Sequence, residues 1–375
     1  MSRKIVVLFD ANPLVRQKTG VGYYTDGLIT ALAKNPNLQL IGHYFKPRGH
    51  LPRLPQAENL SYSHNSWFTG QLAKGLRKFR LRLPWELLAR RQADVLLFPD
   101  FTSWPSLFRT PKILTVHDLT FIDKPEYVQK RNLRYLRRYV KHDARRADLV
   151  LTISNFSKKR LVAEFGLAPQ KVLAEPIPPP PPAKSVKPSG QPAGFILFIG
   201  TLEPRKNVSR LVEAYRLLPE ATRAQHRLVL AGGQGWKAEE MASQIEQLRS
   251  QGENIVQTGY VSDEMRAALY KEAYLVVVPS IYEGFGMPIL EAMSYKAPVV
   301  ASDLAVFKEV AGDAALYFDP NSPQDIKKVI IKLLEDGNLR KIQVQKGSQQ
   351  LEKYSWQTVA DEIYQEIQKL SGETA

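Results

Sequence analysis

Short apolar runs alternate with amphipathic stretches along the whole chain, and this alternation predicts its fold. The runs are rich in Val, Ile and Leu, which is typical of strands buried in a parallel sheet. Strands are expected at 5–10, 38–44, 93–98, 112–116, 149–153, 195–199, 227–231, 255–258, 275–279 and 298–301. Helices are expected around 28–33, 131–145, 155–165, 207–218 and 356–370, and from Pro288 onward. Strands that alternate with helices in this way predict an α/β fold with two Rossmann-like, doubly wound domains.

A proline-rich stretch separates the two halves of the chain. It runs from Pro176 to Pro182 with further prolines up to Pro192. Such a stretch can form neither a helix nor a central strand, so we expect an extended, stiff connector. The predicted organisation is a first domain over 1–175, a linker over 176–193, a second domain over 194–355, and a C-terminal helix over 356–375 that can pack back on the first domain.

The net charge of +15 lies entirely in the first half. Residues 1–175 carry 30 Lys and Arg against 13 Asp and Glu, whereas residues 176–375 carry 22 against 24. Two segments, 74–91 and 130–146, concentrate the excess and interleave it with leucines and aromatics. Basic amphipathic segments of this kind suit an anionic membrane surface or an anionic substrate, and a solvated helix face has the same composition.

Composition excludes several kinds of chemistry. The chain has no cysteine, which rules out disulfides, zinc–thiolate sites, iron–sulfur clusters and cysteine nucleophiles. No run approaches the roughly 18 apolar residues of a membrane span. The apolar run at the start is short and ends at Asp10, so it predicts a strand rather than a signal peptide. We therefore expect a cytoplasmic protein, peripheral at the inner face of the cell membrane.

The most informative motif lies between Glu283 and Glu291. A buried strand precedes it, and Pro288 suits the first position of a following helix. Gly284 and Gly286 let the backbone approach a ligand, and the helix start offers unpaired N–H groups to an anion. We expect Glu283 on the loop and Glu291 in the first helical turn, where both carboxylates can face one molecule that carries phosphate and hydroxyls. A nucleotide sugar fits this description.

Three further groups of residues are candidates for the same site. Arg205 and Lys206 follow a predicted strand and precede a helix, where cations oppose the helix dipole and can neutralise a diphosphate. His117 follows the strand at 112–116, where it is expected to face the crevice between the domains and donate a hydrogen bond to a substrate hydroxyl. Gly20 and Gly22 open the first helix, where amides can approach a phosphate or a sugar.

Together these motifs closely resemble the retaining, GT-B-fold glycosyltransferases of family 4. The family's E-x7-E element corresponds to Glu283 and Glu291, and its phosphate-binding element to residues 203–207. The segments 259–263 and 302–315 also follow the family pattern. The resemblance covers nearly the whole chain and implies a GT-B fold, with two Rossmann-like domains that face each other across a cleft.

The resemblance also implies a role for each candidate residue. Arg205 and Lys206 would bind the donor diphosphate, Glu283 the sugar hydroxyls and Glu291 the ribose hydroxyls. His117 would lie against the donor sugar, and Glu283, Arg205, Lys206 and His117 would be the catalytic group. Backbone groups would complete the donor site at Gly20, Gly22, Tyr260, Val261, Gly284, Phe285, Gly286 and Met287. The proline run replaces an Asn-Gly-Val-Asp-like turn of the family, which predicts stiffer closure of the domains.

The predicted activity is transfer of a hexose from a nucleotide sugar, GDP-mannose being favoured, to a glycan or lipid-linked glycan in bacterial polysaccharide synthesis. No cofactor and no metal are expected, because the chain lacks Asp-x-Asp and metal-ligand spacings. Two other functions stay open: a GT-B epimerase or phosphorylase, and a basic membrane- or nucleic-acid-binding protein. The second leaves the site-like second half without a role, so no nucleic-acid partner is expected.

Overall fold

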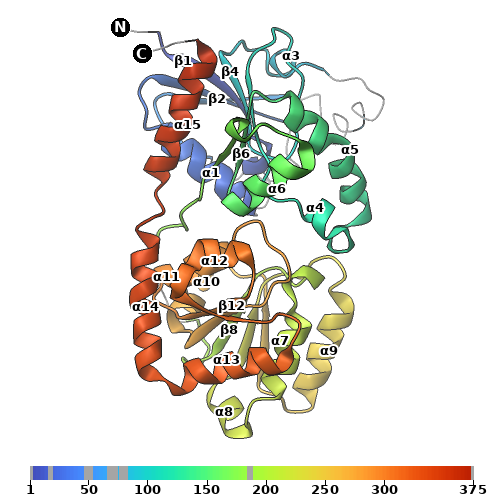
Figure 1. Ribbon diagram of the computed structural model, residues 1–375, viewed down its shortest axis with the longest axis vertical. Helices are drawn as coiled ribbons and strands as arrows, with labels where there is room; N and C mark the ends of the chain where they lie inside the picture. Colours follow the sequence, from blue (N-terminus) through green and yellow to red (C-terminus); the bar gives the residue numbers. More distant parts are fainter. Residues whose placement is uncertain are drawn as a thin grey trace. The chain divides into compact units, whose positions relative to one another are not determined.

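The computed structural model describes residues 3–15, 20–45, 54–65, 75, 83–183 and 189–372. The chain divides into two compact units, drawn in Figure 1. Unit 1 draws on Met1–Leu119, Lys130–Ile177 and Ser355–Ala375, and unit 2 on Thr120–Gln129 and Pro178–Tyr354. The short segment Thr120–Gln129, with helices α4 (Thr120–Asp123) and η2 (Pro125–Tyr127), therefore belongs to unit 2 although its neighbours in the sequence belong to unit 1. The sequence did not predict this exchange.

Unit 1 is built on a parallel sheet with the strand order β3-β2-β1-β4-β5-β6-β7 over the described residues. Its strands are β1 (Ile5–Asp10), β2 (Leu38–Phe45), β3 (Leu60–Asn65), β4 (Val95–Phe98), β5 (Lys112–Thr115), β6 (Leu149–Thr152) and β7 (Val172–Ala174). The five predicted strands are confirmed. The other two, β3 and β7, are edge strands without a long apolar run, because an edge strand is covered less completely than a central one.

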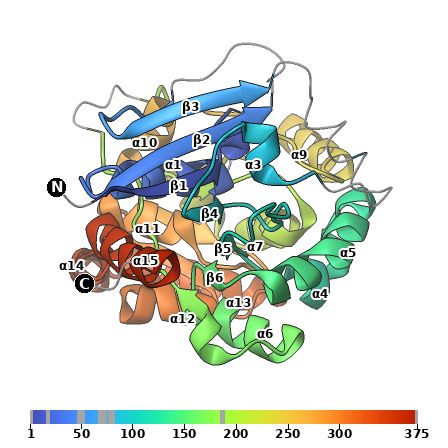
Figure 2. The same cartoon turned by 90° about the horizontal axis from the view of Figure 1, so that it is seen from above.

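Helices flank this sheet on both faces, as Figure 2 shows from above. They are α1 (Gly20–Leu32), α3 (Trp85–Ala89), α5 (Lys130–Arg146), α6 (Asn155–Phe165) and α15 (Trp356–Ser371). The last helix packs against the first: a Cβ added to Gly27 of α1 would lie 2.2 Å from Cζ2 of Trp356. Glycine at position 27 thus makes room for the indole ring that seats α15.

A buried carboxyl group marks the point where the chain leaves unit 1. Glu175 follows β7, is 2% exposed, and donates its backbone N–H to the carbonyl of Thr152. Burial raises the pKa of Glu175 to about 9, and the neighbouring carboxyl of Glu362 on α15 adds to the shift. Glu175 is therefore protonated at neutral pH, because burial disfavours its carboxylate and the adjacent Glu362 would repel a second negative charge.

Unit 2 repeats the architecture with the strand order β10-β9-β8-β11-β12-β13, and its paired strands are parallel. The strands are β8 (Ile196–Ile199), β9 (Leu228–Ala231), β10 (Ile255–Gly259), β11 (Leu275–Val278), β12 (Val299–Ser302) and β13 (Ala315–Phe318). The helices are α7 (Val208–Arg216), α8 (Glu220–Gln225), α9 (Glu239–Ser250), α10 (Asp263–Glu272), α11 (Met287–Ser294), α12 (Ala305–Ala311), α13 (Pro323–Glu335) and α14 (Gly337–Leu351). The prediction of two Rossmann-like α/β units is confirmed.

The ends of β8 and β9 approach each other so closely that glycine is required. Gly232 has φ of +145°, and a Cβ there would lie 1.9 Å from the carbonyl oxygen of Gly200. Glycine alone adopts this φ readily, and it has no side chain that would collide with Gly200. The contact holds the loops that follow the two strands against each other, at the edge of the sheet where open α/β folds bind ligands.

The helices of the described residues include none that is long and apolar enough to cross a membrane.

Candidate active site

Two neighbouring strands of unit 2 bring the predicted site residues together. Strand β8 leads into the short helix η4 (Pro204–Lys206), and β11 leads into the loop that ends at α11. Because β8 and β11 pair in parallel, their carboxyl ends lie at the same edge of the sheet. Arg205, Lys206 and Glu283 meet there, although 77 residues separate Lys206 from Glu283.

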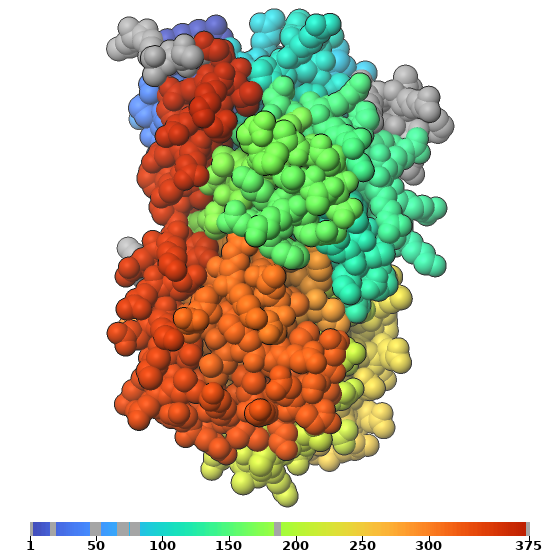
Figure 3. Space-filling model, in the orientation of Figure 1, coloured from blue at the N-terminus to red at the C-terminus, as the bar shows by residue number. Residues whose placement is uncertain are grey.

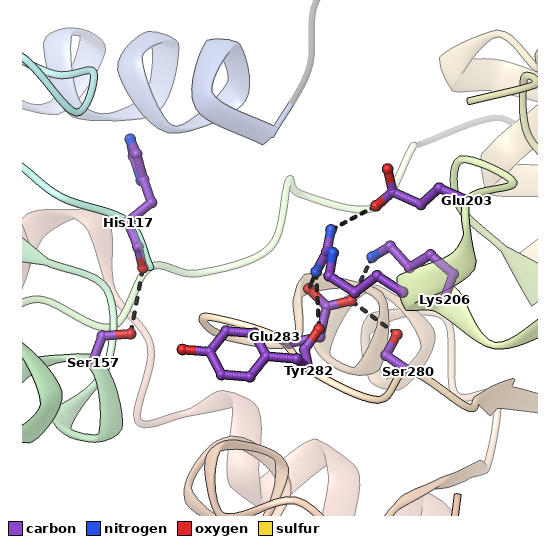
Figure 4. Close-up of polar contacts among 8 residues, drawn as sticks. His117, Ser157, Glu203, Lys206, Ser280, Tyr282 and Glu283 are labelled. Atoms are coloured by element: carbon purple, nitrogen blue, oxygen red, sulfur yellow. Dashed lines mark hydrogen bonds and ion pairs between the residues drawn. The ribbon is translucent and has the colours of Figure 1, made fainter. Parts of the chain in front are cut away.

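Glu283 is the centre of an ion cluster, shown in Figure 4. Arg205 donates from Nη1 to Oε2 of Glu283 at 2.5 Å, and Lys206 donates from Nζ to Oε1 at 2.5 Å. Ser280 adds a hydrogen bond from Oγ to Oε1 at 2.9 Å. Arg205 also donates to Oε1 of Glu203 at 2.8 Å. The cluster thus balances two cations with two carboxylates.

The cations decide the charge of Glu283. Its side chain is 12% exposed, and burial alone would raise its pKa. The charges of Arg205 and Lys206 and the hydrogen bonds from Lys206 and Ser280 outweigh burial and lower the pKa of Glu283 to about 2. Glu283 is therefore a carboxylate at every physiological pH, able to accept further hydrogen bonds from hydroxyl groups.

Backbone contacts fix the two loops of the cluster to each other. Asn207 has φ of 59° and is buried, and its amide donates to the carbonyls of Pro279 at 3.0 Å and Pro320 at 2.8 Å. The backbone N–H of Ile281 donates to the carbonyl of Arg205 at 2.9 Å. The cluster geometry is consequently set by the fold rather than by mobile surface side chains.

The glycine-bearing loop leads into α11 as the sequence predicts, with one difference. Gly286 caps the helix with φ of +141°, and an added Cβ would lie 3.1 Å from the ring of Phe307, so glycine is needed here. The helix begins at Met287, and its first turn contains no acidic residue. The prediction that Glu291 lies in the first turn is therefore wrong: it lies just beyond it. Phe285 is buried, and its predicted backbone contact with the donor stays a prediction.

Glu291 has its own partners. The hydroxyl of Tyr270 donates to Oε2 at 2.8 Å, and Nη1 of Arg266 lies 3.3 Å from Oε1. Burial raises the pKa of Glu291, which Arg266 and the Tyr270 hydrogen bond oppose. Glu291 thus has other partners than the Glu283 cluster, and the different roles predicted for the two glutamates stay predictions.

The predicted base-binding segment lies at the end of β10. Tyr260 is 65% exposed, and the preceding Gly259 accepts a hydrogen bond from Gly232 N at 2.9 Å. An added Cβ on Gly233 would lie 3.9 Å from Cβ of Tyr260. Tyr260 and Val261 therefore share the ligand-binding edge of the sheet with Arg205, two strands away in the strand order.

In unit 1, His117 follows β5 and is buried. Its Nε2 lies 2.9 Å from the carbonyl oxygen of Pro99, to which it donates, and the ring packs edge-on to Tyr24 at 4.9 Å. Burial lowers the pKa of His117, so the ring is neutral and Nδ1 carries the lone pair. The expected donor is then an acceptor at Nδ1. Ser157 donates to the backbone carbonyl of His117 at 3.4 Å (Figure 4).

The N-terminal glycines take different positions in α1. Gly20 is exposed at the first residue of the helix, and an added Cβ would meet nothing within 4 Å. Gly22 is buried in the first turn. Packing therefore gives no reason for glycine at position 20, and its predicted role in donor binding stays a prediction.

Sequence reasoning missed several residues that touch the site. Ser280 and Glu203 bind members of the ion cluster, and Arg266 and Tyr270 bind Glu291. Arg266 and Tyr270 are four apart in α10, which places them on one helix face and would have marked them as a pair. Tyr282 lies beside Glu283, and its hydroxyl donates to Asp123 of α4 at 2.9 Å.

Solved structures of glycosyltransferases share this architecture. Sucrose-phosphate synthase from Thermosynechococcus elongatus superimposes with a TM-score of 0.74 at 17% identity, covering 99% of this chain and 100% of that chain. WaaG, a glycosyltransferase involved in lipopolysaccharide biosynthesis, has a TM-score of 0.70 at 16% identity, covering 98% and 100%. At such identities the likeness shows the fold alone, which is GT-B.

Sequence comparison identifies the family. Residues 183–350 match the family described as Glycosyl transferases group 1, and residues 19–174 match Glycosyltransferase Family 4. The chain is 34% identical over 369 residues to O-antigen chain mannosyltransferase B of Escherichia coli, which covers 94% of this chain and 96% of that protein. The chain belongs to the group 1, family 4 glycosyltransferases, as the resemblance in its motifs implies.

Proposed function

We propose that this glycosyltransferase transfers a hexose, with retention of configuration, from a nucleoside diphosphate sugar to a glycan or lipid-linked glycan acceptor in bacterial polysaccharide synthesis. The observation that carries the proposal is the partly buried cluster of Arg205, Lys206 and Glu283 at the carboxyl edge of the sheet of unit 2. GDP-mannose is the favoured donor because the E. coli relative is an O-antigen chain mannosyltransferase.

The cations of the cluster suit a diphosphate. Arg205 presents a planar fork of donors and Lys206 a compact charge, and both bind Glu283, which lies on the loop that leads into the N-terminus of α11. A diphosphate bound there would meet two positive charges and a helix dipole. Because negative charge grows on the diphosphate as the sugar leaves, the same groups would stabilise the transition state more than the bound donor.

The carboxylates suit the hydroxyls of the donor. Glu283 stays ionised next to the diphosphate and would accept hydrogen bonds from hydroxyls of the transferred sugar. Glu291, held by Tyr270 and Arg266, would accept from the ribose. His117 would still lie against the donor sugar, but its neutral ring would accept a hydrogen bond at Nδ1 where donation was predicted.

These groups would support retention without a metal. The acceptor hydroxyl would attack the face of the sugar from which the diphosphate departs, and a departing phosphate oxygen would take its proton. Arg205 and Lys206 would supply the charge stabilisation that a divalent cation gives in metal-dependent transferases.

The acceptor is proposed to be held at an anionic membrane. Helix α5 exposes eight cationic side chains: Lys130, Arg131, Arg134, Arg137, Arg138, Lys141, Arg145 and Arg146. Figure 3 shows long side chains of this helix projecting from the surface. Of the second predicted segment, 74–91, only residues 75 and 83–91 are described, so most of its basic residues lie outside the described structure.

The test is transfer by the purified protein to a lipid-linked or synthetic glycan acceptor, with GDP-, UDP- and dTDP-sugars offered in turn and products identified by mass spectrometry and NMR. The expected result is an α-linked product from GDP-mannose at a rate that EDTA leaves unchanged. A product of inverted configuration, or a rate abolished by EDTA and restored by Mn²⁺, would refute the mechanism.

A matched pair of lysine variants links the activity to the cluster. Lys206→Met should reduce transfer by at least about 100-fold, the range lost with one preorganised donor in other enzymes. Lys328→Met, at an exposed position of α13, should leave it unchanged. Conversion of the donor in the absence of acceptor would instead assign the protein to the epimerases.

A further inference from the structure

Unit 1 exposes four large apolar side chains in two short segments. Leu83 is 37% exposed and Leu87 54%, and in the loop before β5 Leu107 is 46% and Phe108 59% exposed. We call these four residues the apolar tip. Single exposed leucines need no explanation, whereas neighbouring ones mark an interaction surface.

Hydrogen bonds hold the two segments of the apolar tip together. The carboxylate of Glu86, on α3 beside Leu87, is buried and accepts from Ser106 Oγ at 2.6 Å, from Leu107 N at 3.2 Å and from Thr110 Oγ1 at 3.0 Å. The backbone of α3 joins the same loop through Trp85 N and Pro105 O, at 2.9 Å. The two segments that carry Leu87 and Leu107 are therefore joined in one hydrogen-bonded unit.

An aromatic cluster supports the apolar tip from beneath. Trp85 is fully buried, and its ring lies 5.1 Å from that of His43, 5.9 Å from Phe45 and 6.0 Å from Trp104. The side chains beneath α3 thus fill the interior, while those of the apolar tip remain in solvent. Because the aromatic cluster fills the interior beneath α3, the side chains of the apolar tip have no space to turn inward and stay exposed.

The charged side chains exposed on these segments are all cationic. Arg90, Arg91 and Arg109 are exposed, whereas the carboxylate of Glu86 is buried under the loop. The same loop is joined to α5, since Ser103 N donates to Asp143 at 3.0 Å. Within unit 1, α3 and α5 lie on the side away from α15 in both ribbon views (Figures 1 and 2).

We propose that the apolar tip inserts into the interfacial layer of an anionic bilayer, with Arg90, Arg91 and Arg109 in contact with lipid phosphates. The occupant is inferred from charge: a cationic rim around aliphatic and aromatic groups complements a surface of anionic headgroups over acyl chains. The inference rests on the proposed membrane contact of unit 1, and it does not depend on the identity of the sugar.

Insertion of the apolar tip and electrostatic adsorption of the basic helix α5 differ in their dependence on salt. Electrostatic attraction alone falls as salt rises, whereas buried apolar area adds binding that salt does not screen. Vesicle binding by the whole protein should therefore persist in part at high salt, and the persisting part should depend on the apolar tip.

The absence of cysteine allows a site-specific test on the full-length protein. Phe108→Cys is labelled with a polarity-sensitive fluorophore and mixed with vesicles of phosphatidylglycerol and phosphatidylcholine. Ile342→Cys, at a position 48% exposed in unit 2, is the matched control. The label at 108 should shift to the blue with anionic vesicles and not with pure phosphatidylcholine, while the label at 342 should not shift. No shift at 108 in a sample that sediments with the vesicles would overturn the proposal.

A second pair of variants measures the contribution to binding. Leu107→Ser with Phe108→Ser should weaken sedimentation with anionic vesicles about ten-fold or more, from the loss of two partly buried apolar side chains. Leu217→Ser, 43% exposed in unit 2, should bind like the wild type. Equal binding by the double variant would reduce the contact to electrostatic adsorption, and a change in oligomeric state instead would assign the tip to a second copy of the chain. In either case transfer to a water-soluble acceptor would still test the proposed function separately.

Discussion

Replacing Glu283 by glutamine tests whether the ion cluster is organised by charge. The amide keeps the size of the side chain and removes its negative charge, which leaves Arg205 and Lys206 facing a neutral group in a site where Glu283 is 12% exposed. Breaking a buried pair from one side leaves uncompensated charge and is strongly destabilising. We therefore expect Glu283→Gln to lower the stability of unit 2 as well as to abolish transfer.

The size of the effect follows from the pKa of Glu283. Its fall from 4.5 to about 2 corresponds to about 3 kcal/mol in favour of the charged, folded form. Because the folded pKa is the lower one, this stabilisation is present above pH 4.5 and is lost as pH falls toward 2. For a unit of this size, about 3 kcal/mol corresponds to roughly 6–12 °C in the melting temperature.

Differential scanning calorimetry of wild type and Glu283→Gln at pH 7 and pH 3 measures this difference. The variant should melt lower at pH 7. The gap should narrow at pH 3, because the unfolded wild type is already protonated at Glu283 there while the folded protein still keeps most of the carboxylate ionised. Glu203→Gln is the matched control, because Glu203 contacts only Arg205 of the two cations and is 25% exposed. If Glu283→Gln melts with the wild type at pH 7, or if the gap does not depend on pH, the electrostatic account of the cluster is wrong.

Three further predictions concern the framework. Glu175→Gln should raise the melting temperature at pH 8 and flatten its pH dependence, because the raised pKa of Glu175 makes the wild type lose stability as pH rises from 4.5 toward 9; an unchanged pH profile would contradict this. Gly232→Ala should cost about 3 kcal/mol or more and abolish nucleotide-induced thermal shifts, since its Cβ would collide with Gly200 O; normal nucleotide binding would be the contrary result. Gly27→Ala should lower the melting temperature by displacing Trp356, at a cost of about 1–3 kcal/mol, and should do so less in a Trp356→Ala background.

Central strands and the position of Arg205 and Lys206 after a strand could be predicted from the sequence because local patterns encode them. The run at β11 is apolar on both faces since helices cover both, and the cations at 205 and 206 follow a strand directly. In contrast, β3 reads Leu-Ser-Tyr-Ser-His-Asn, a polar run whose strand character depends on pairing with β2 rather than on its own composition.

Partners supplied from distant segments could not be predicted. The contact of Tyr282 with Asp123 joins residues 159 apart, and no local pattern shows that Thr120–Gln129 groups with unit 2. The tautomer of His117 was likewise hidden, because it depends on a carbonyl at Pro99 that only the fold brings near.

The three-segment construction of unit 1 also has a consequence for biosynthesis. As the chain leaves the ribosome, strands β1 to β7 of unit 1 are complete once Ala174 is made, but the face of α1 at Gly27 has no cover until Trp356 is made. Unit 2 has all of its segments once residue 354 has emerged, before α15 is complete. Domains usually fold in the order of synthesis. Here unit 2 can finish folding first, and unit 1 is completed only when α15 packs onto it.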